Sequence, residues 1–234
     1  MAENVAMLHA NDGRNRQQLP EEVATYVREL ILSGAVRPGE FLRMERIAEA
    51  VGVSNTPVRE GLLALRSEGF VRLEPRRGFV VAPFSRQDVH DLFWAQAQLA
   101  SELAARAAKK LTREQLQHLE ELDERHEQAV KDGDSDAVAE LGRAFHREIN
   151  RAADSHRLAL LLESVVQQLP NRFYATIEGQ VAATRERHPE LLAALHQRNA
   201  RTVRSLMQKH IIEGADHLIE ALESRGMWSD SEED

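Results

Sequence analysis

The chain of 234 residues contains no cysteine. This absence excludes a disulfide framework, a thiolate metal site and a thiol nucleophile. No apolar run reaches the roughly 18 residues of a membrane-spanning helix, so we expect no transmembrane segment. The N-terminal segment also lacks the apolar region of a secretory signal peptide, and we therefore expect the protein in the reducing cytoplasm. Only 12 glycines and 7 prolines occur beside 42% apolar residues, a composition typical of a folded protein.

An excess of positive charge, the usual sign of a duplex-binding protein, is also missing, since the formal net charge is -8. The charge is unevenly distributed along the chain. Arginine and glutamate nearly cancel over residues 20–86, whereas acidic residues outnumber basic ones over residues 87–234. The overall acidity therefore describes the second part of the chain more than the first.

Two changes of pattern suggest the domain boundaries. Residues 1–18 are polar without periodicity, and residues 224–234 end in an acidic block, so we expect both ends to be disordered. Up to residue 83 the sequence mixes helical and strand-like patterns, and after it only helical ones occur. We predict a mostly α protein with a first domain over residues 19–83 and an all-α domain over residues 84–223.

The first domain has the spacing of a helix-turn-helix. Apolar periodicity predicts a helix over residues 20–32 and a second one over residues 42–51, which ends at Gly52. A third helix begins at Ser54, a good N-cap residue, with Pro57 tolerated in its first turn. Two helices joined by a glycine-containing turn are typical of this motif.

A hairpin follows the third helix. Residues 70–74 and 78–81 are short β-prone runs, and Pro75, Arg76 and Arg77 separate them. We interpret the hairpin as a wing with a cationic tip. Such a tip is suited to the DNA backbone or the minor groove.

The third helix carries side chains that can meet DNA. Asn55, Thr56 and Arg59 occupy its first turn and a half, where side chains and backbone N–H groups reach phosphates or base edges. The arginine can contact O6 and N7 of guanine together. A second interpretation stays open, in which the motif serves packing alone and Arg59 pairs with a neighbouring glutamate. The predicted DNA-binding residues are Arg43, Ser54, Asn55, Thr56, Pro57, Arg59, Arg66, Arg76, Arg77 and Gly78.

These residues closely resemble the winged helix-turn-helix of the GntR family of bacterial transcription regulators. The resemblance covers about residues 19–83 and implies a homodimer on a palindromic double-stranded operator. Asn55 stands where many relatives have a base-contacting arginine, and we expect a changed operator preference because asparagine favours adenine. Gly61 replaces the usual alanine, at a cost in helix propensity of about 1 kcal/mol. The matching stretches are VGVSNTPVREGL (51–62), Leu65, EGFV (68–71) and RRGFVV (76–81).

The second domain predicts helices only. Capping boxes at Ser85 and Thr112 open two long periodic segments, and Gly133 ends the second one. The pattern predicts a bundle of six or seven helices, with a kink at Pro170. The further helices fit residues 136–152, 156–180, 189–197 and 200–223.

Ten histidines in a cysteine-free chain raise the question of a metal site. His146 adjoins an apolar helix face, His210 lies on an apolar stripe, and His188 precedes Pro189 at a predicted helix start. His188 and His210 converge only if the chain turns between them, because the intervening residues would span about 33 Å as one straight helix. Residues 197–199 (QRN) supply that turn. Each histidine also fits the simpler interpretation of a hydrogen-bonded core residue. Of the other histidines, four have no partner at ligand spacing: His90, His118, His126 and His156.

Stretches around these three histidines look like the FCD ligand-binding domain of FadR-like GntR regulators, over residues 85–223. The resemblance implies an antiparallel helical bundle with a central pocket, where His146, His188 and His210 hold a divalent metal together with an aspartate one turn before the first. Gly142 stands in place of that aspartate. The matching stretches are RAFHREI (143–149), HPELLAAL (188–195) and MQKH (207–210).

The absence of the carboxylate determines which metals and ligands the site favours. Nitrogen-only ligation favours Zn or Ni over Mn or Mg, and the missing ligand leaves an open position for water or an anionic effector. Trp94 and Gln96 lie near where relatives have a glutamate and an arginine, and Arg172 could bind an anion. The predicted effector pocket is therefore lined by Trp94, Gln96, Gly142 and Arg172.

Three functions are compatible with the sequence. The first is a transcription regulator, expected to be a repressor, whose operator affinity changes when a small carboxylate or a metal binds in the helical domain. The second is an architectural DNA-binding dimer without an effector, which the departures at Trp94 and Gln96 keep open. The third, a His-metal hydrolase, is disfavoured because the chain has no His-Glu-x-x-His motif, no cysteine and no glycine-rich phosphate loop. We expect a regulator without enzymatic activity and without a membrane partner.

Overall fold

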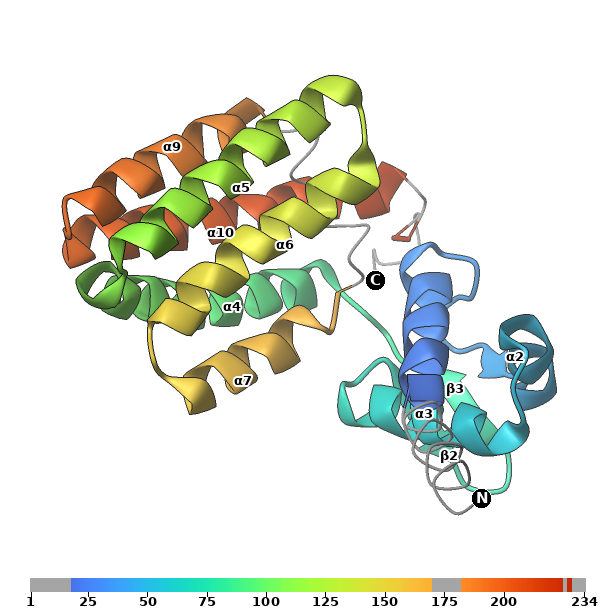
Figure 1. Cartoon of the computed structure of the whole chain (residues 1–234). Helices are drawn as coiled ribbons and strands as arrows, with labels where there is room; N and C mark the ends of the chain where they lie inside the picture. The colour runs from blue at the N-terminus through green and yellow to red at the C-terminus, as the bar shows by residue number, and fades with distance from the viewer. Residues whose placement is uncertain (1–17, 170–181, 225–226, 229–234) are drawn as a thin grey trace, which may run out of the picture. The chain divides into compact units, whose positions relative to one another are not determined.

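The computed structural model describes residues 18–169, 182–224 and 227–228 (Figure 1). The described residues form two units. One unit extends to Ser85 and includes the described residues from Leu222 onward, and the other covers Arg86–Ala221. No helix in these ranges is long and apolar enough to cross a membrane.

The first unit is a winged helix-turn-helix. A helix over residues 18–32 precedes α2 (Met44–Val51) and α3 (Asn55–Ser67). Gly52 ends α2 in the left-handed conformation, with φ of 77°, which glycine adopts without strain. Ser54 is the N-cap of α3 as predicted, although its side chain makes no capping hydrogen bond.

A small antiparallel sheet completes this unit. The predicted hairpin is present as β2 (Val71–Glu74) and β3 (Gly78–Val81). The sheet also contains β1 (Phe41–Leu42), which pairs with the other edge of β3 and gives the strand order β1-β3-β2. The sequence placed Leu42 in the second helix, but α2 begins only at Met44 because β1 draws the preceding residues into the sheet.

Gly61 has a packing role that helix propensity does not show. A Cβ atom there would lie 2.6 Å from the carbonyl oxygen of Pro20 and 2.9 Å from Cγ1 of Val23. The absence of a side chain therefore lets the N-terminal helix approach α3 closely. The two helices and the sheet share one buried core, formed by Val23, Val27, Ile31, Val58, Leu62, Leu65, Phe70 and Val80.

The second unit is an all-α bundle, as predicted (Figure 1). Helix α5 packs against α6 and α9, and α4 packs against α6 and α7. Thr112 and Gln115 form a reciprocal capping box at the start of α5, and Gly133 ends that helix with φ of 72°. The helices are α4 (Arg86–Lys110), α5 (Arg113–Asp132), α6 (Ser135–Ala152), α7 (His156–Val166), α9 (Ala182–His196) and α10 (Ala200–Ser224).

Two helix boundaries differ from the predicted ones. The helix expected over residues 156–180 ends at Val166, and the kink expected at Pro170 lies outside the described residues. Helix α9 begins at Ala182 and contains Pro189 in its interior, so His188 is not at a helix start. The sequence concealed this start because residues 182–187 (AATRER) have no apolar periodicity.

An ion-pair network on α4 connects this helix with α10. Arg106 lies one helical turn after Glu102, and its Nε donates a hydrogen bond of 2.7 Å to the carboxylate. Arg204 of α10 binds the same carboxylate. Hydrogen bonds from Arg106 and Arg204 lower the pKa of Glu102 below its ordinary value.

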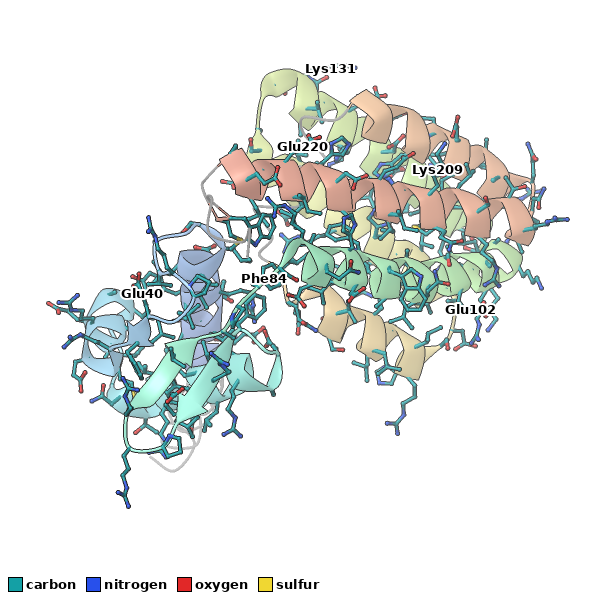
Figure 2. The ribbon with its side chains drawn as sticks, turned by 180° about the vertical axis from the view of Figure 1, so that it is seen from behind. Glu40, Phe84, Glu102, Lys131, Lys209 and Glu220 are labelled. Carbon is teal, nitrogen blue, oxygen red and sulfur yellow. The ribbon has the colours of Figure 1, made fainter. Side chains whose placement is uncertain are left out.

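The structure describes part of the C-terminal segment for which the sequence predicts disorder. Helix α10 reaches Ser224, and the N–H of Met227 donates to the carbonyl oxygen of Leu222. Trp228 Nε1 donates a hydrogen bond of 2.6 Å to the carbonyl oxygen of Phe84, which is labelled in Figure 2. The Phe84 ring in turn stacks on Phe70 of the winged unit, with 5.3 Å between centroids.

Candidate DNA interface and metal centre

Helix α3 has one buried and one exposed face. Val58, Leu62 and Leu65 are fully buried. Asn55 and Arg59 are exposed, and their spacing of four residues places them on one face of the helix. The exposed face begins at the N-terminus of the helix, where backbone N–H groups remain available to an anion.

The wing turns at Arg76, which is exposed and has a φ of 63°. Arg77 has a different environment: its guanidinium lies 4.4 Å from the ring centroid of Phe41 and 3.9 Å from the Glu74 carboxylate. The cation–π contact and the ion pair hold Arg77 along the sheet. Arg76 and Arg77 are both exposed, so the tip presents two cations to solvent.

The other predicted DNA-binding residues differ in accessibility. Arg43 at the N-cap of α2 is exposed, as are Ser54, Thr56 and Arg66, and Gly78 is half-buried. Pro57 is buried, because the first turn of α3 places every third or fourth residue toward the core. It can fix the start of the helix, and a direct contact between Pro57 and DNA stays a prediction.

The three predicted metal-binding histidines come together in the helical unit. His146 comes from α6, His188 from α9 and His210 from α10, and their ligand atoms lie within 4.8 Å of one another. Nε2 of His146 and Nε2 of His210 are 3.2 Å apart. The turn at residues 197–199 that this convergence requires is present, with Arg198 in the left-handed conformation.

His188 is at the centre of the histidine cluster. Its side chain is 2% exposed, and Phe145 stacks on its ring with 4.3 Å between centroids. Its ring also lies 5.3 Å from that of His210 and 5.7 Å from that of His146. In the described part of the chain, Nε2 of His188 is buried and makes no hydrogen bond.

Sequence reasoning missed two residues beside this cluster. Asp123 Oδ1 lies 3.0 Å from Nδ1 of His188, and the ring of His126 lies 5.3 Å from that of His188. Both residues come from α5, and together with His188 they form a second group with metal-ligand spacing. The conclusion that His126 has no such partner is therefore wrong. The signal was an Asp-x-x-His pair on the same face as the buried residues Leu119 and Leu122.

The predicted pocket residues that the structure describes differ in burial. Gly142 is buried in α6 one turn before His146 and offers no ligand. Gln96 is buried, but Trp94 is 61% exposed and faces solvent, so it does not line an enclosed pocket. Trp94 and Gln96 are two residues apart, so their side chains lie about 200° apart around the helix, which explains why one is exposed and the other buried. Arg172 lies outside the described residues.

The histidine cluster fits a tetrahedral divalent ion. Zinc–nitrogen bonds of about 2.0–2.1 Å place two ligand nitrogens about 3.3 Å apart, close to the 3.2 Å between His146 and His210. The buried Nε2 of His188 would also gain a partner, and such unsatisfied atoms are rare in protein interiors. Three imidazole nitrogens and no carboxylate favour Zn or Ni.

A winged helix-turn-helix on one unit and an all-α second unit together define a two-domain DNA-binding transcription regulator. Comparison with known families identifies the family of regulators. The family described as bacterial regulatory proteins, gntR family, matches residues 19–81, and the FCD domain matches residues 91–213. The chain belongs to the GntR family of regulators with an FCD domain.

Similar proteins carry the same assignment. The HTH-type transcriptional regulator McbR of Escherichia coli is 28% identical over 186 residues, which cover 76% of this chain and 84% of the relative. The regulator YdhC of Bacillus subtilis is 25% identical, covering 84% and 89%. The solved structure of E. coli McbR has a TM-score of 0.66 at 25% identity and covers 87% of this chain and 98% of its own. These relatives are regulators and not enzymes.

Proposed function

We propose that this regulator is a repressor that binds a palindromic operator as a homodimer. A small carboxylate, bound in the helical unit at a divalent ion, changes its affinity for the operator. Two similar proteins, RspR of E. coli and the gluconate operon protein of Bacillus licheniformis, are named transcriptional repressors. Both names support the proposal that this regulator represses transcription.

The DNA-binding half of the proposal rests on the exposed face of α3. Asn55 and Arg59 lie beside a helix N-terminus, where the backbone dipole attracts a phosphate and both side chains can enter the major groove. A dimer places two copies of this helix about one turn of DNA apart, or a multiple of it, and this distance fixes the spacing between the two half-sites of the operator. A palindromic sequence is the consequence of that symmetry.

The part of the proposal that concerns effector binding rests on the convergence of His146, His188 and His210. The ion, when bound, supplies an electrophilic position for an anionic oxygen. The three imidazoles come from α6, α9 and α10, and Gly142 leaves the fourth position without a protein ligand. An effector carboxylate at that position would hold the three helices in one arrangement, which is the differential interaction that coupling to DNA requires.

A second function is an architectural dimer without an effector. Trp94 favours it, because an indole that is 61% exposed on α4 is suited to a contact between protomers. In that case the helical unit only dimerises. A thermal-shift screen of small carboxylates against the zinc-treated protein separates the two functions, since only the sensor gains stability from a ligand.

The DNA interface is tested by selecting bound duplexes from a random pool and measuring affinity for the selected sequence. We expect an inverted repeat. Arg59→Ala should lose about 1–3 kcal/mol of binding free energy and relax specificity at one position. Arg76→Ala should weaken all sequences similarly and lower the salt slope by about one charge. Arg37→Ala is the matched control, an exposed arginine of the same unit outside the predicted interface. Wild-type affinity of Arg59→Ala would refute the recognition-helix assignment.

The metal site is tested by elemental analysis of protein purified without a metal-affinity column, before and after zinc or nickel is added and excess ion removed. We expect one ion per chain, lost in His188→Ala and in His210→Ala. His156→Ala, at the exposed start of α7, is the matched control and should keep the ion. Substoichiometric metal that neither cluster substitution changes would end the metal hypothesis and leave the DNA-binding proposal standing.

A further inference from the structure

Asp123 binds the histidine at the centre of the cluster. Its Oδ1 lies 3.0 Å from His188 Nδ1, and its side chain is 13% exposed. An ionised carboxylate only accepts hydrogen bonds, so Nδ1 is the donor in this pair. The lone pair of the neutral ring is then on Nε2, which is the nitrogen left for the cluster with His146 and His210.

The charge of the site points to the same carboxylate. Three neutral imidazoles cancel none of the charge of a divalent ion, and Gly142 contributes none. A ligand histidine that donates its other N–H to a carboxylate is more basic and is held in one orientation, and such partners are a recurrent feature of metal sites. Asp123 is the carboxylate in that position here.

We propose that Asp123 is the positioning carboxylate of the metal site. It fixes the tautomer and orientation of His188 and supplies, from α5, the negative charge that Gly142 does not supply from α6. Helix α5 thereby joins α6, α9 and α10 as a fourth helix whose position depends on the bound ion. This inference rests on the metal part of the proposed function.

A competing arrangement uses the same residues differently. Asp123, His126 and His188 also have ligand spacing, so an ion could bind directly to them. The two arrangements are exclusive for Asp123, because an oxygen that accepts the Nδ1–H hydrogen bond does not bind an ion together with that nitrogen. They differ in the role of His126, which is a ligand only in the second.

The test measures zinc affinity of the full chain by competition with a chromophoric chelator. Asp123→Ala should weaken binding about 10–100-fold, and Asp123→Asn should lose less, because its amide oxygen still accepts from Nδ1. Glu120→Gln is the matched control: Glu120 Oε1 lies 2.8 Å from His196 Nε2, and this pair joins the same two helices at a half-exposed position. We expect wild-type affinity for Glu120→Gln and for His126→Gln.

A second measurement removes the effect of folding stability. The melting temperature of each variant is measured with and without zinc, and the zinc-induced increase should be smallest for Asp123→Ala, intermediate for Asp123→Asn and unchanged for Glu120→Gln. A variant that is merely less stable shifts both melting temperatures together.

Three outcomes would overturn the inference, and the first two of them leave the metal part of the proposed function intact. The first is wild-type zinc affinity of Asp123→Ala. The second is an equal loss in Glu120→Gln, which would assign the effect to helix packing. The third is an equal loss in His126→Gln, which would place the ion on Asp123, His126 and His188. A wild-type protein that binds no zinc overturns both the inference and the metal site.

Discussion

Replacing Gly61 with alanine has two effects of opposite sign on the free energy of unfolding. Alanine in a helix interior is favoured over glycine by about 1 kcal/mol. The new Cβ would lie 2.6 Å from the Pro20 carbonyl oxygen and 2.9 Å from Val23 Cγ1. The first of these atoms belongs to the backbone and cannot rotate away, so the N-terminal helix has to shift. Overpacking of this kind costs about 1–3 kcal/mol, and we expect a net destabilisation of up to about 2 kcal/mol.

Native-state hydrogen exchange measures this effect in the full chain, because it reports each helix separately. Amides of α3 should exchange faster in Gly61→Ala, while those of α5 serve as an internal reference in the other unit. Ala64→Gly is the matched control, since Ala64 is exposed on the same helix and reports propensity alone. If Gly61→Ala protects α3 by as much as Ala64→Gly weakens it, the close approach of the helices contributes nothing and the steric argument fails.

Two further predictions concern Trp228, which follows α10, and Glu102 in α4. Trp228→Phe removes the hydrogen bond to the Phe84 carbonyl and should destabilise the winged unit by about 1 kcal/mol, whereas a chain ending after Trp228 should match wild type in the same exchange experiment. Glu102→Gln should lower the free energy of unfolding of the helical unit, measured by urea titration at pH 7, by less than about 1 kcal/mol, since the carboxylate is 31% exposed. Because Arg106 and Arg204 lower the pKa of Glu102, the carboxylate stabilises the fold above its unfolded-state pKa, and the difference should disappear as the pH falls through the folded-state value.

Local signals in the sequence were sufficient for most of the elements. The Thr112–Gln115 capping box and Gly133 each act within one helical turn, so the local sequence sets both boundaries of α5. Strand β1 has no such signal. Two residues show no periodicity, and Phe41–Leu42 becomes a strand only because β3 offers its free edge across a long sequence separation. The start of α9 was missed for a related reason, since its first turns carry no apolar pattern.

The metal-binding residues show where pattern recognition ends. His146, His188 and His210 were found because the motif around each of them is contiguous in the sequence. Asp123 is 65 positions from His188, and the hydrogen bond between them exists only because α5 packs against α9. A carboxylate that is lost at one position of a site can be replaced from any neighbouring helix that brings a charge to the same ring. Gly142 lacks the carboxylate of the resembling family, and a residue that compensates for it is found in the packed structure and not in the sequence. Electrostatic interactions depend on distance and not on order along the chain.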